Sequence, residues 1–458
     1  MRAYLATSIG VVCTAALVLP LAPAAGAAAP PPSDPLSRAS APAASSRAPD
    51  SPAGGTQSLA LGNLGGPRVA GSAAVQGLTR RDVRPFSLVG VVWDDAETEL
   101  HGTVQVRTRA TGGTAWSEWQ DVETHNLEHA ADPGTAERAS GPVRGATAPL
   151  WVGDSDGVEV RVRAERAAAL PEGLHLELVD PGEDPAAEAW AEVPADPAAD
   201  RAVEAASAAA AAVSDDAADG VRSVSLAAAE GTVIPALSQD ETRALYAENL
   251  ALRAKPYIGP RPRIITRKGW GADERLREKK FVYTKKVKAA FVHHSATGNN
   301  YTCKQAPSVL RSIYRYHVVS SGWRDFGYNF AVDKCGNIYE GRAGGVSKPV
   351  LGAHTRGFNT NSMGIAVLGT FGSSTPPAAA VTAVARLTAW KLGLFGANPR
   401  GTTTLTSGGG NLYKKGRKVR LNVISGHRDG FATSCPGARL YKKLGATRTA
   451  SAKYQGRS

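Results

Sequence analysis

The sequence predicts a multidomain protein: a C-terminal mixed α/β domain, with a central sheet flanked by helices, preceded by an all-β sandwich-like domain. The β domain is indicated by short β-branched and aromatic runs with period-two alternation, such as "GTVQVRTR" and "LHLELVD", separated by Gly, Asp and Pro. The α/β domain is indicated by strand-like and helix-like segments that alternate towards the C-terminus. A chain of 458 residues is long enough for such domains to bury a core each.

The N-terminus has the layout of a secretory signal. Arg2 precedes an uncharged apolar run, and "APAAGAAAP" follows with an A-x-A match at residues 25–27. The run approaches membrane-spanning length, but Pro20 and Pro23 would break a spanning helix. We therefore expect residues 1–27 to be a signal peptide and the mature protein to be secreted, associated with the cell wall and without stable membrane insertion.

Composition divides the rest of the chain. Residues 28–83 are rich in Pro, Ala and Ser and predict a disordered spacer. The β-sandwich accessory domain is assigned to residues 84–182, and an Ala-rich acidic linker with one short helix to residues 183–255. The α/β domain then takes residues 256–458.

Charge differs strongly between the two halves. Residues 1–250 carry 17 lysines and arginines against 34 acidic residues, whereas residues 251–458 carry 36 against 7. A cationic domain outside a cell favours anionic wall polymers as partners rather than nucleic acid, although a charged run is also typical of a merely solvated surface. The clusters "REKKFVYTKKVK" and "LYKKGRKVR" carry much of this charge.

Individual elements of the α/β domain can be read from the pattern. "KKVKAAFVHHSAT" and "NSMGIAVLG" predict strands, and "GYNFAVDKCGNIYEGR" predicts a hairpin that turns at residues 336–337. Helices are expected over "QAPSVLRSIYRYHVVS", "AAAVTAVARLTAWKLGLFG" and "GARLYKKLGATR".

Three cysteines remain outside the signal, an odd number for an exported protein. Cys303 precedes a predicted helix and Cys335 lies at the predicted hairpin, so a disulfide between them would close a loop worth roughly 3–4 kcal/mol in the chain-entropy model. Cys435 has a histidine nearby, His427. A helix would hold those two side chains too far apart, but Gly430 and Pro436 predict a loop, which can bring both to one point.

Thiolate and imidazole are ligands that zinc selects, and a catalytic zinc needs three protein ligands with a fourth position open. The pair His293 and His294 ends a predicted strand, where neighbouring side chains face opposite ways, so one of the two can reach the metal. Spacing does not choose between them, and a free buried thiol beside core histidines is the alternative. The histidines of the β domain, including His129, show no ligand pattern and are expected to have surface or packing roles.

Five ordered motifs then resemble a known family. "FVHHSAT", "GWRDFGYNF", "GNIYEGR", "GAHTRGFNTNSMGIAVLG" and "SGHRDGFATSCPG" are similar to the peptidoglycan recognition protein and type 2 N-acetylmuramoyl-L-alanine amidase family. The resemblance begins at "ITRKGWGADE" and covers about 195 residues. It implies a zinc hydrolase that cleaves the amide between N-acetylmuramic acid and L-alanine.

The resemblance also implies site residues. The family's Zn²⁺ ligands fall on His293, His427 and Cys435, and its catalytic tyrosine on Tyr328, with Thr433 as a further hydrogen-bond donor. Matching motifs imply substrate contacts at five positions: His317, Trp323, Arg342, His354 and Asn359. Two of these have alternatives, since Trp323 is also a packing candidate and Arg342 could pair with Asp325 or Glu340. His294 is expected to make a structural hydrogen bond.

Two function classes stay open from the sequence. The first is an exported, monomeric zinc amidase of peptidoglycan, and the second is a protein that binds or senses wall fragments without cleaving them. The three ligands and the tyrosine favour the enzyme. For the β domain, the alternatives are a wall-binding module, a spacer or an inhibitory cover over the groove.

Overall fold

The computed structural model describes residues 54–64, 74–139, 143–165, 168–184, 231–247 and 257–458. All of them belong to one unit, Asp50–Ser458. The predicted signal peptide and residues 28–53 of the predicted spacer lie outside the described residues. Within the described ranges, no helix combines the length and apolar character needed to cross a membrane.

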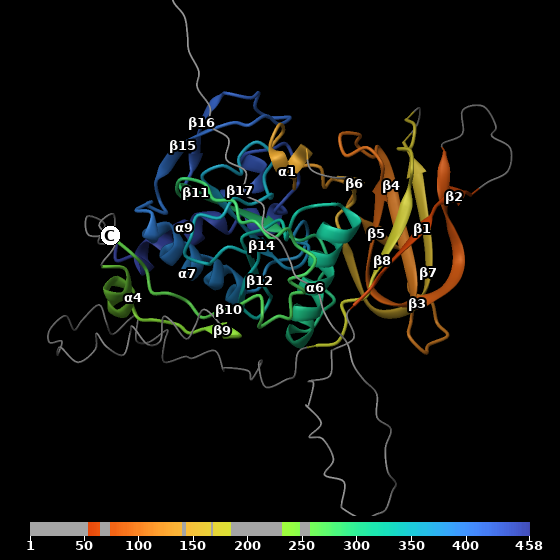
Figure 1. The fold of residues 1–458 in the computed structure, drawn as a ribbon, viewed down its shortest axis with the longest axis horizontal. Helices are drawn as coiled ribbons and strands as arrows, with labels where there is room; N and C mark the ends of the chain where they lie inside the picture. The colour runs from red at the N-terminus through yellow and green to blue at the C-terminus, as the bar shows by residue number, and fades with distance from the viewer. Residues whose placement is uncertain (1–53, 65–73, 140–142, 166–167, 185–230, 248–256) are drawn as a thin grey trace, which may run out of the picture. The chain divides into compact units, whose positions relative to one another are not determined.

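An antiparallel sheet of eight strands forms the N-terminal domain and confirms its predicted all-β character (Figure 1). The strand order is β1-β8-β3-β7-β4-β5, with β2 and β6 paired to β3. β3 pairs with β7 across three register shifts, and such irregularities bend a strand, so its N-terminal part joins β2 and its C-terminal part joins β8 and β6. The bounds are β1 Thr56–Ala60, β2 Gly62–Asn63, β3 Val75–Trp93, β4 Gly102–Ala110, β5 Gln120–Val122, β6 Gly145–Ala146, β7 Leu150–Ala164 and β8 His175–Val179.

The predicted spacer, residues 28–83, is wrong where the structure describes it. β1, β2 and the first part of β3 lie in this segment. β1 is held by a five-residue antiparallel ladder to β8. Its backbone hydrogen bonds go to a partner more than a hundred residues away, so local composition gives no sign of the pairing.

A mixed seven-stranded sheet forms the centre of the C-terminal domain, in the order β17-β11-β14-β12-β13-β10-β9. β11 pairs in parallel with both β14 and β17, and β12 pairs in parallel with β14. The predicted hairpin is β12 with β13, which are antiparallel. The bounds are β9 Val233–Ile234, β10 Ile264–Ile265, β11 Ala289–His294, β12 Phe330–Val332, β13 Ile338–Glu340, β14 Ser362–Val367 and β17 Ile424–Gly426, and a separate hairpin joins β15 Thr402–Thr406 to β16 Lys418–Asn422.

Strand alternation divides the side chains between two faces of this sheet. Ala290, Val292 and Ile365 pack in one core with helix α7 (Ala378–Leu394) and with Leu444 of α9 (Leu444–Tyr454). On the other face, Ala331 and Ala366 pack with helix α6 (Ala306–Arg315). The C-terminal domain is therefore a sheet flanked by helices, as predicted (Figure 1).

Helix α6 also joins the two domains. Leu88, Val92 and Val179 of the β domain share one core with Val309 and Ile313 of α6. The helix is consequently buried on almost every side, including Arg311, whose guanidinium donates to the carbonyls of Pro181 and Trp270. It continues as the π-helical turn η3 (Tyr316–Ser320), so the predicted helix is confirmed along its length.

Two further segments differ from expectation. β9 and helix α4 (Gln239–Tyr246) lie in the predicted linker 183–255, yet β9 adds an edge strand beside β10. α4 confirms the short helix predicted in this segment, and it begins with a capping box between Ser238 and Glu241. The predicted last helix is divided into α8 (Ala438–Tyr441) and α9.

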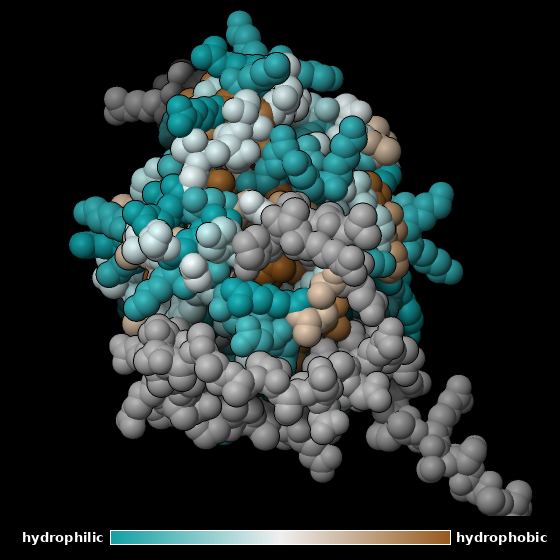
Figure 2. All heavy atoms as spheres, turned by 90° about the vertical axis from the view of Figure 1, so that its left-hand side faces the viewer, coloured by the Kyte–Doolittle hydropathy of each residue, from teal (hydrophilic) through white to brown (hydrophobic). Residues whose placement is uncertain are grey.

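The surface agrees with the cationic composition. The face drawn in Figure 2 is mainly hydrophilic, with scattered hydrophobic residues. Lys279, Lys280, Lys285 and Lys286 of the first basic cluster are exposed, as is Lys415 of the second.

Cys303 and Cys335 form a disulfide that links the start of α6 to the β12–β13 turn. We predict that replacing both by serine lowers the free energy of unfolding by roughly 3–4 kcal/mol, because the unfolded chain regains the freedom of a closed loop. Urea denaturation under oxidising conditions measures this. Adding reductant should lower the stability of the parent chain and leave the double variant unchanged; equal stability of the two oxidised proteins would contradict the prediction.

Candidate metal centre

Strand pairing places two histidines beside each other. β11 and β17 are parallel neighbours in which Val292 is opposite Gly426, so the next residues along the two strands are His293 and His427. Carboxyl ends of parallel strands meet at the same edge of a sheet. His293 follows the alternation of Phe291, which faces away from α7, and its ring centroid lies 4.5 Å from that of His427.

Cys435 reaches the same point on the loop after the short 3₁₀ helix η4 (His427–Asp429). The Arg428 backbone N–H donates to the Cys435 carbonyl over 3.1 Å, which closes the loop. The Cys435 Sγ lies 3.8 Å from the His293 Nδ1. The backbone N–H of Cys435 also donates to the Thr433 Oγ1. The loop geometry expected from Gly430 and Pro436 is thus the one observed.

A fourth side chain, His129, completes the cluster and comes from the β domain. Its Nε2 lies 3.2 Å from the His427 Nδ1, and one ligand atom from each of His129, His293, His427 and Cys435 lies within 4.8 Å of the others. His129 was expected to have a surface or packing role; the structure instead places it among the candidate metal ligands. Residues 125–129 read His-Asn-Leu-Glu-His, the H-x-x-E-H spacing of a known zinc motif, and this local signal was missed. Only His129 of the motif joins the cluster, because His125 is exposed and the packing of the two domains brings His129 here.

The donor set fits zinc. Burial lowers the pKa of His129, His293 and His427 well below the ordinary value, so all three are neutral imidazoles, the form that binds metals. Burial raises the pKa of the Cys435 thiol, and a bound cation would reverse that preference by stabilising the thiolate. The Nδ1 of His129 and the Nε2 of His427 have no hydrogen-bond partner among the described residues. Three nitrogens and one sulfur, buried together, are ligands that zinc selects.

Two more predicted groups lie at the cluster. The Tyr328 ring centroid is 5.2 Å from that of His293 and 5.9 Å from that of His129. Burial raises the pKa of Tyr328 well above its ordinary value, so its hydroxyl stays protonated and is able to donate. Thr433 lies two residues before Cys435, and its hydroxyl donates to the Glu128 carboxylate over 2.7 Å.

His294 points to the opposite face, where its Nδ1 accepts from the Phe371 backbone N–H. It therefore makes a structural hydrogen bond.

The predicted substrate residues surround this centre. The His354 ring centroid lies 5.4 Å from that of His293, and Thr355 bridges the two rings through its hydroxyl. The Asn359 side-chain carbonyl accepts from the backbone N–H groups of His354 and Thr355, and so fixes this turn.

His317 and Trp323 stack with ring centroids 4.4 Å apart, so the packing role considered for Trp323 is real. Arg342 pairs with neither Asp325 nor Glu340; it makes a two-pronged contact with Glu137, while Asp325 pairs with Arg267. Glu137 was not foreseen because it lies 205 positions away in the sequence.

His317 provides a pH-dependent prediction. Burial, with a smaller effect from Arg342, lowers the pKa of His317 from 6.5 to about 3, so the unfolded chain binds a proton below pH 6.5 that the folded chain does not. Stability is therefore complete above pH 6.5 and falls as the pH drops towards 3, by up to about 1.4 kcal/mol per pH unit from this residue. In urea titrations, His317→Gln should show a shallower loss between pH 6.5 and 5, whereas exposed His101→Gln should follow the parent. An unchanged slope in His317→Gln would refute the assignment.

Comparisons with known proteins agree with this geometry. Residues 283–438 match the family described as N-acetylmuramoyl-L-alanine amidase, and residues 32–213 match the family described as Rv3811 N-terminal galactose-binding domain-like. Peptidoglycan-recognition protein SC2 of Drosophila melanogaster is 30% identical over 183 residues, which are 40% of this chain and 84% of that protein. Peptidoglycan-recognition protein SC1a of the same organism is 34% identical over 155 residues, covering 34% and 70%.

Among solved structures, a tyrosine-to-phenylalanine variant of Drosophila PGRP-LB in complex with tracheal cytotoxin is 25% identical, with a TM-score of 0.32, and covers 40% of this chain and 93% of its own. The chain thus joins a galactose-binding-like β domain to an amidase-family domain that carries a buried group of three histidines and one cysteine. It belongs to the peptidoglycan recognition protein and N-acetylmuramoyl-L-alanine amidase family.

Proposed function

We propose that this protein is an exported zinc-dependent amidase that hydrolyses the bond between N-acetylmuramic acid and L-alanine in peptidoglycan. The observation that carries the proposal is the convergence of His293, His427 and Cys435 on one buried point beside Tyr328. Family members that only bind wall fragments need no such donor set. Zinc, when bound, would supply Lewis acidity and lower the pKa of a coordinated water.

The chain's own groups would do the remaining work. His293 and His427 are held rigidly, because both backbones belong to or adjoin paired strands. The protonated hydroxyl of Tyr328 would donate to the oxyanion that develops on the amide carbonyl, and the Thr433 hydroxyl would add a second donor. Thr355 would fix the orientation of the His293 ring by bonding its Nε2. Together these groups would stabilise negative charge at the carbonyl.

The substrate proposal draws on the relatives and on the charge of the surface. The names of the relatives, peptidoglycan-recognition proteins, and of the matching amidase family support peptidoglycan as the ligand class here. The exposed lysines of the two basic clusters would add attraction to anionic wall polymers, which moderate salt should weaken. Secretion is proposed from the N-terminal signal pattern alone.

The ligand assignment predicts the metal content. We expect about one zinc per parent chain, and a loss of affinity of more than about 100-fold in Cys435→Ser and His427→Ala, since even indirect changes near a metal cost up to that factor. Elemental analysis and competition with a chelator measure this, together with new L-alanine amines released from peptidoglycan.

His101→Ala, which removes an exposed β-domain imidazole, is the matched control and should keep its zinc. Amine release by folded Cys435→Ser at the parent rate would disprove the proposed function. Zinc binding without any amine release, in the parent and in every variant described below, would instead favour the binding or sensing class.

The tyrosine assignment separates catalysis from metal binding. Tyr328→Phe should retain zinc and lower the turnover rate by about 10²-fold, the cost of removing one oxyanion donor. Tyr283→Phe removes a hydroxyl that bonds the Gly344 carbonyl at an exposed site and is the control. Parent-like turnover by Tyr328→Phe would rule out the donor role.

A further inference from the structure

We propose that residues 126–138, here called the plug segment, keep the enzyme latent: His129 takes the fourth position at the metal, and neighbouring carboxylates and carbonyls occupy the groove's hydrogen-bond donors. The proposal rests on the proposed function. Of the three roles considered for the β domain, this is the inhibitory cover over the groove. The covering residues belong to a single connection of that domain.

Four protein side chains, one more than a catalytic zinc needs, meet at the candidate metal centre. A catalytic zinc site keeps one position for water or substrate, whereas a site with four protein ligands is closed. His129 is 5% exposed, and its imidazole lies among His293, His427 and Cys435 as closely as they lie to one another. With His129 in place, a tetrahedral ion would have no free position. The proposed catalytic ligands His293, His427 and Cys435, together with His129, therefore form a closed site.

Asn359, which the family resemblance implies as a substrate contact, is already hydrogen-bonded. The plug segment occupies its side-chain amide, which donates to the Ala130 carbonyl over 2.8 Å and to the Asp132 carboxylate over 2.7 Å. The same Asp132 oxygen accepts from the backbone N–H of Gly357 over 2.8 Å. A carboxylate and a peptide carbonyl of the chain therefore fill a polar site that a peptide substrate would otherwise fill.

Two further predicted groups are occupied in the same way. Glu137 contacts both terminal nitrogens of Arg342, over 2.7 and 2.8 Å, and both side chains are buried. Glu128 accepts the hydrogen bond of Thr433, the proposed second donor to the oxyanion. The plug segment thus contacts the metal ligands, Thr433, Arg342 and Asn359 together. One polypeptide stretch presents carboxylates and carbonyls, the chemistry of a stem peptide, to all of these groups.

The plug segment belongs to the long connection between β5 and β6. β5 ends at Val122 and β6 begins at Gly145, and within the described part of this connection the sole regular element is the one-turn helix α1 (Ala136–Ala139). Connections of this length in a compact domain are usually functional. Both ends belong to the β sheet, which shares a core with α6, so the segment is positioned by a fixed base.

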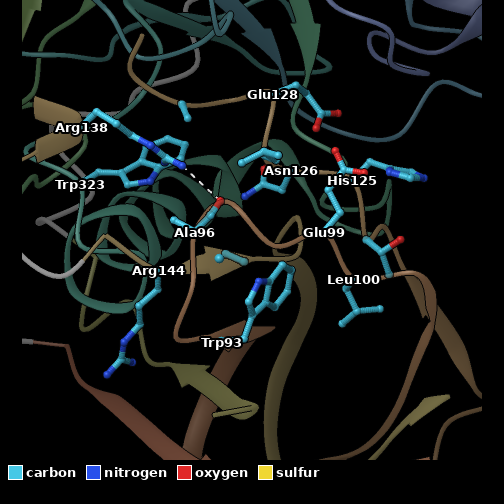
Figure 3. A pocket seen from close by; sticks show the side chains of 15 residues that line it. Trp93, Ala96, Glu99, Leu100, His125, Asn126, Glu128, Arg138, Arg144 and Trp323 are labelled. Atoms are coloured by element: carbon cyan, nitrogen blue, oxygen red, sulfur yellow. Dashed lines mark hydrogen bonds between the residues drawn. The ribbon is translucent and has the colours of Figure 1, made fainter. Parts of the chain in front are cut away.

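A small pocket borders the plug segment. A cavity of about 30 Å³ lies there, lined by Trp93, Leu100, His125, Asn126 and Trp323 among others (Figure 3). Figure 3 shows Arg138 at one wall, where it donates to the Ala96 carbonyl. The plug segment accepts hydrogen bonds from Arg342, Asn359 and Thr433, and an acidic peptide ligand would compete for these donors directly.

The test uses the full-length chain loaded with Co²⁺ or Zn²⁺, comparing the parent with His129→Ala and, as matched control, His125→Ala. His125 belongs to the same connection but is exposed. X-ray absorption of the Co²⁺ proteins should give three nitrogens and one sulfur in the parent and in His125→Ala, and one nitrogen replaced by oxygen in His129→Ala. Calorimetry of the Zn²⁺ proteins with a soluble muramyl tripeptide whose lactyl–alanine amide is replaced by a non-hydrolysable linkage should show binding about tenfold tighter in His129→Ala. This is the gain expected when a groove that is open about a tenth of the time becomes open.

A second pair of variants tests the plug segment at a residue outside the metal cluster, in case His129→Ala disturbs the folding of the metal centre. Asp132→Ala should also tighten tripeptide binding, whereas Asp132→Asn keeps an oxygen acceptor and should bind as the parent does. Identical coordination in the parent and His129→Ala, or tripeptide affinity unchanged in both His129→Ala and Asp132→Ala, would overturn the plug.

Amine release separates the two proposals. Faster release by His129→Ala supports both, whereas loss of release with zinc retained would make His129 a catalytic group and overturn the plug. Altered coordination and tighter binding without release in any protein would support the plug and refute the amidase.

Discussion

The parallel pairing of β11 with β17 is the constraint on which the functional centre depends. Its register puts His293 and His427 at neighbouring strand ends, and strand alternation turns His293 away from α7 while His294 faces it. The strand register alone therefore holds the His293 and His427 imidazoles next to each other. Of the three candidate ligands from the C-terminal domain, Cys435 alone arrives on a loop, and that loop is tied back to Arg428 at its start. Preorganised ligands of this kind hold a metal in one geometry at little cost in chain entropy.

The two domains form one unit because they share apolar surface and because charges meet across their boundary. The β domain is acidic and the C-terminal domain is basic. Individual ion pairs join the two domains across their boundary. Glu97 pairs with Arg356, and Glu137 pairs with Arg342 in a buried, two-pronged contact. A buried pair contributes little net stability compared with apolar packing, but breaking it leaves an uncompensated charge. Such pairs therefore specify where the β domain rests more than they strengthen the fold.

The same boundary gives the candidate metal centre an unusual composition. Three of its four donors belong to the amidase-family domain and the fourth belongs to the β domain. Two side chains that would meet a peptide substrate, Arg342 and Asn359, are already hydrogen-bonded to carboxylates and a carbonyl of that domain. A site with four candidate donors, whose groove residues Arg342, Asn359 and Thr433 are already hydrogen-bonded to the β domain, is poorly explained as a resting open enzyme. It is well explained as a latent site in which the plug segment occupies the place of the peptide substrate.

Residue pattern and local chemistry by themselves determined the two-part fold class, the strand that ends in His293 and His294, the main helices, and the loop that carries His427 and Cys435. These features depend on side-chain periodicity and on Gly and Pro, which act over a few residues. The choice of His293 over His294 needed the family resemblance before the structure and the sheet faces after it. Tertiary structure alone decided the strands within the predicted spacer, the shared core around α6, the partner of Arg342 and the place of His129. The H-x-x-E-H spacing of residues 125–129 is a local metal-ligand signal, but it does not show which residues His129 joins. Each of these features is a contact between segments far apart in the chain, and the energy that fixes it comes from strand pairing and packing that form only in the folded protein.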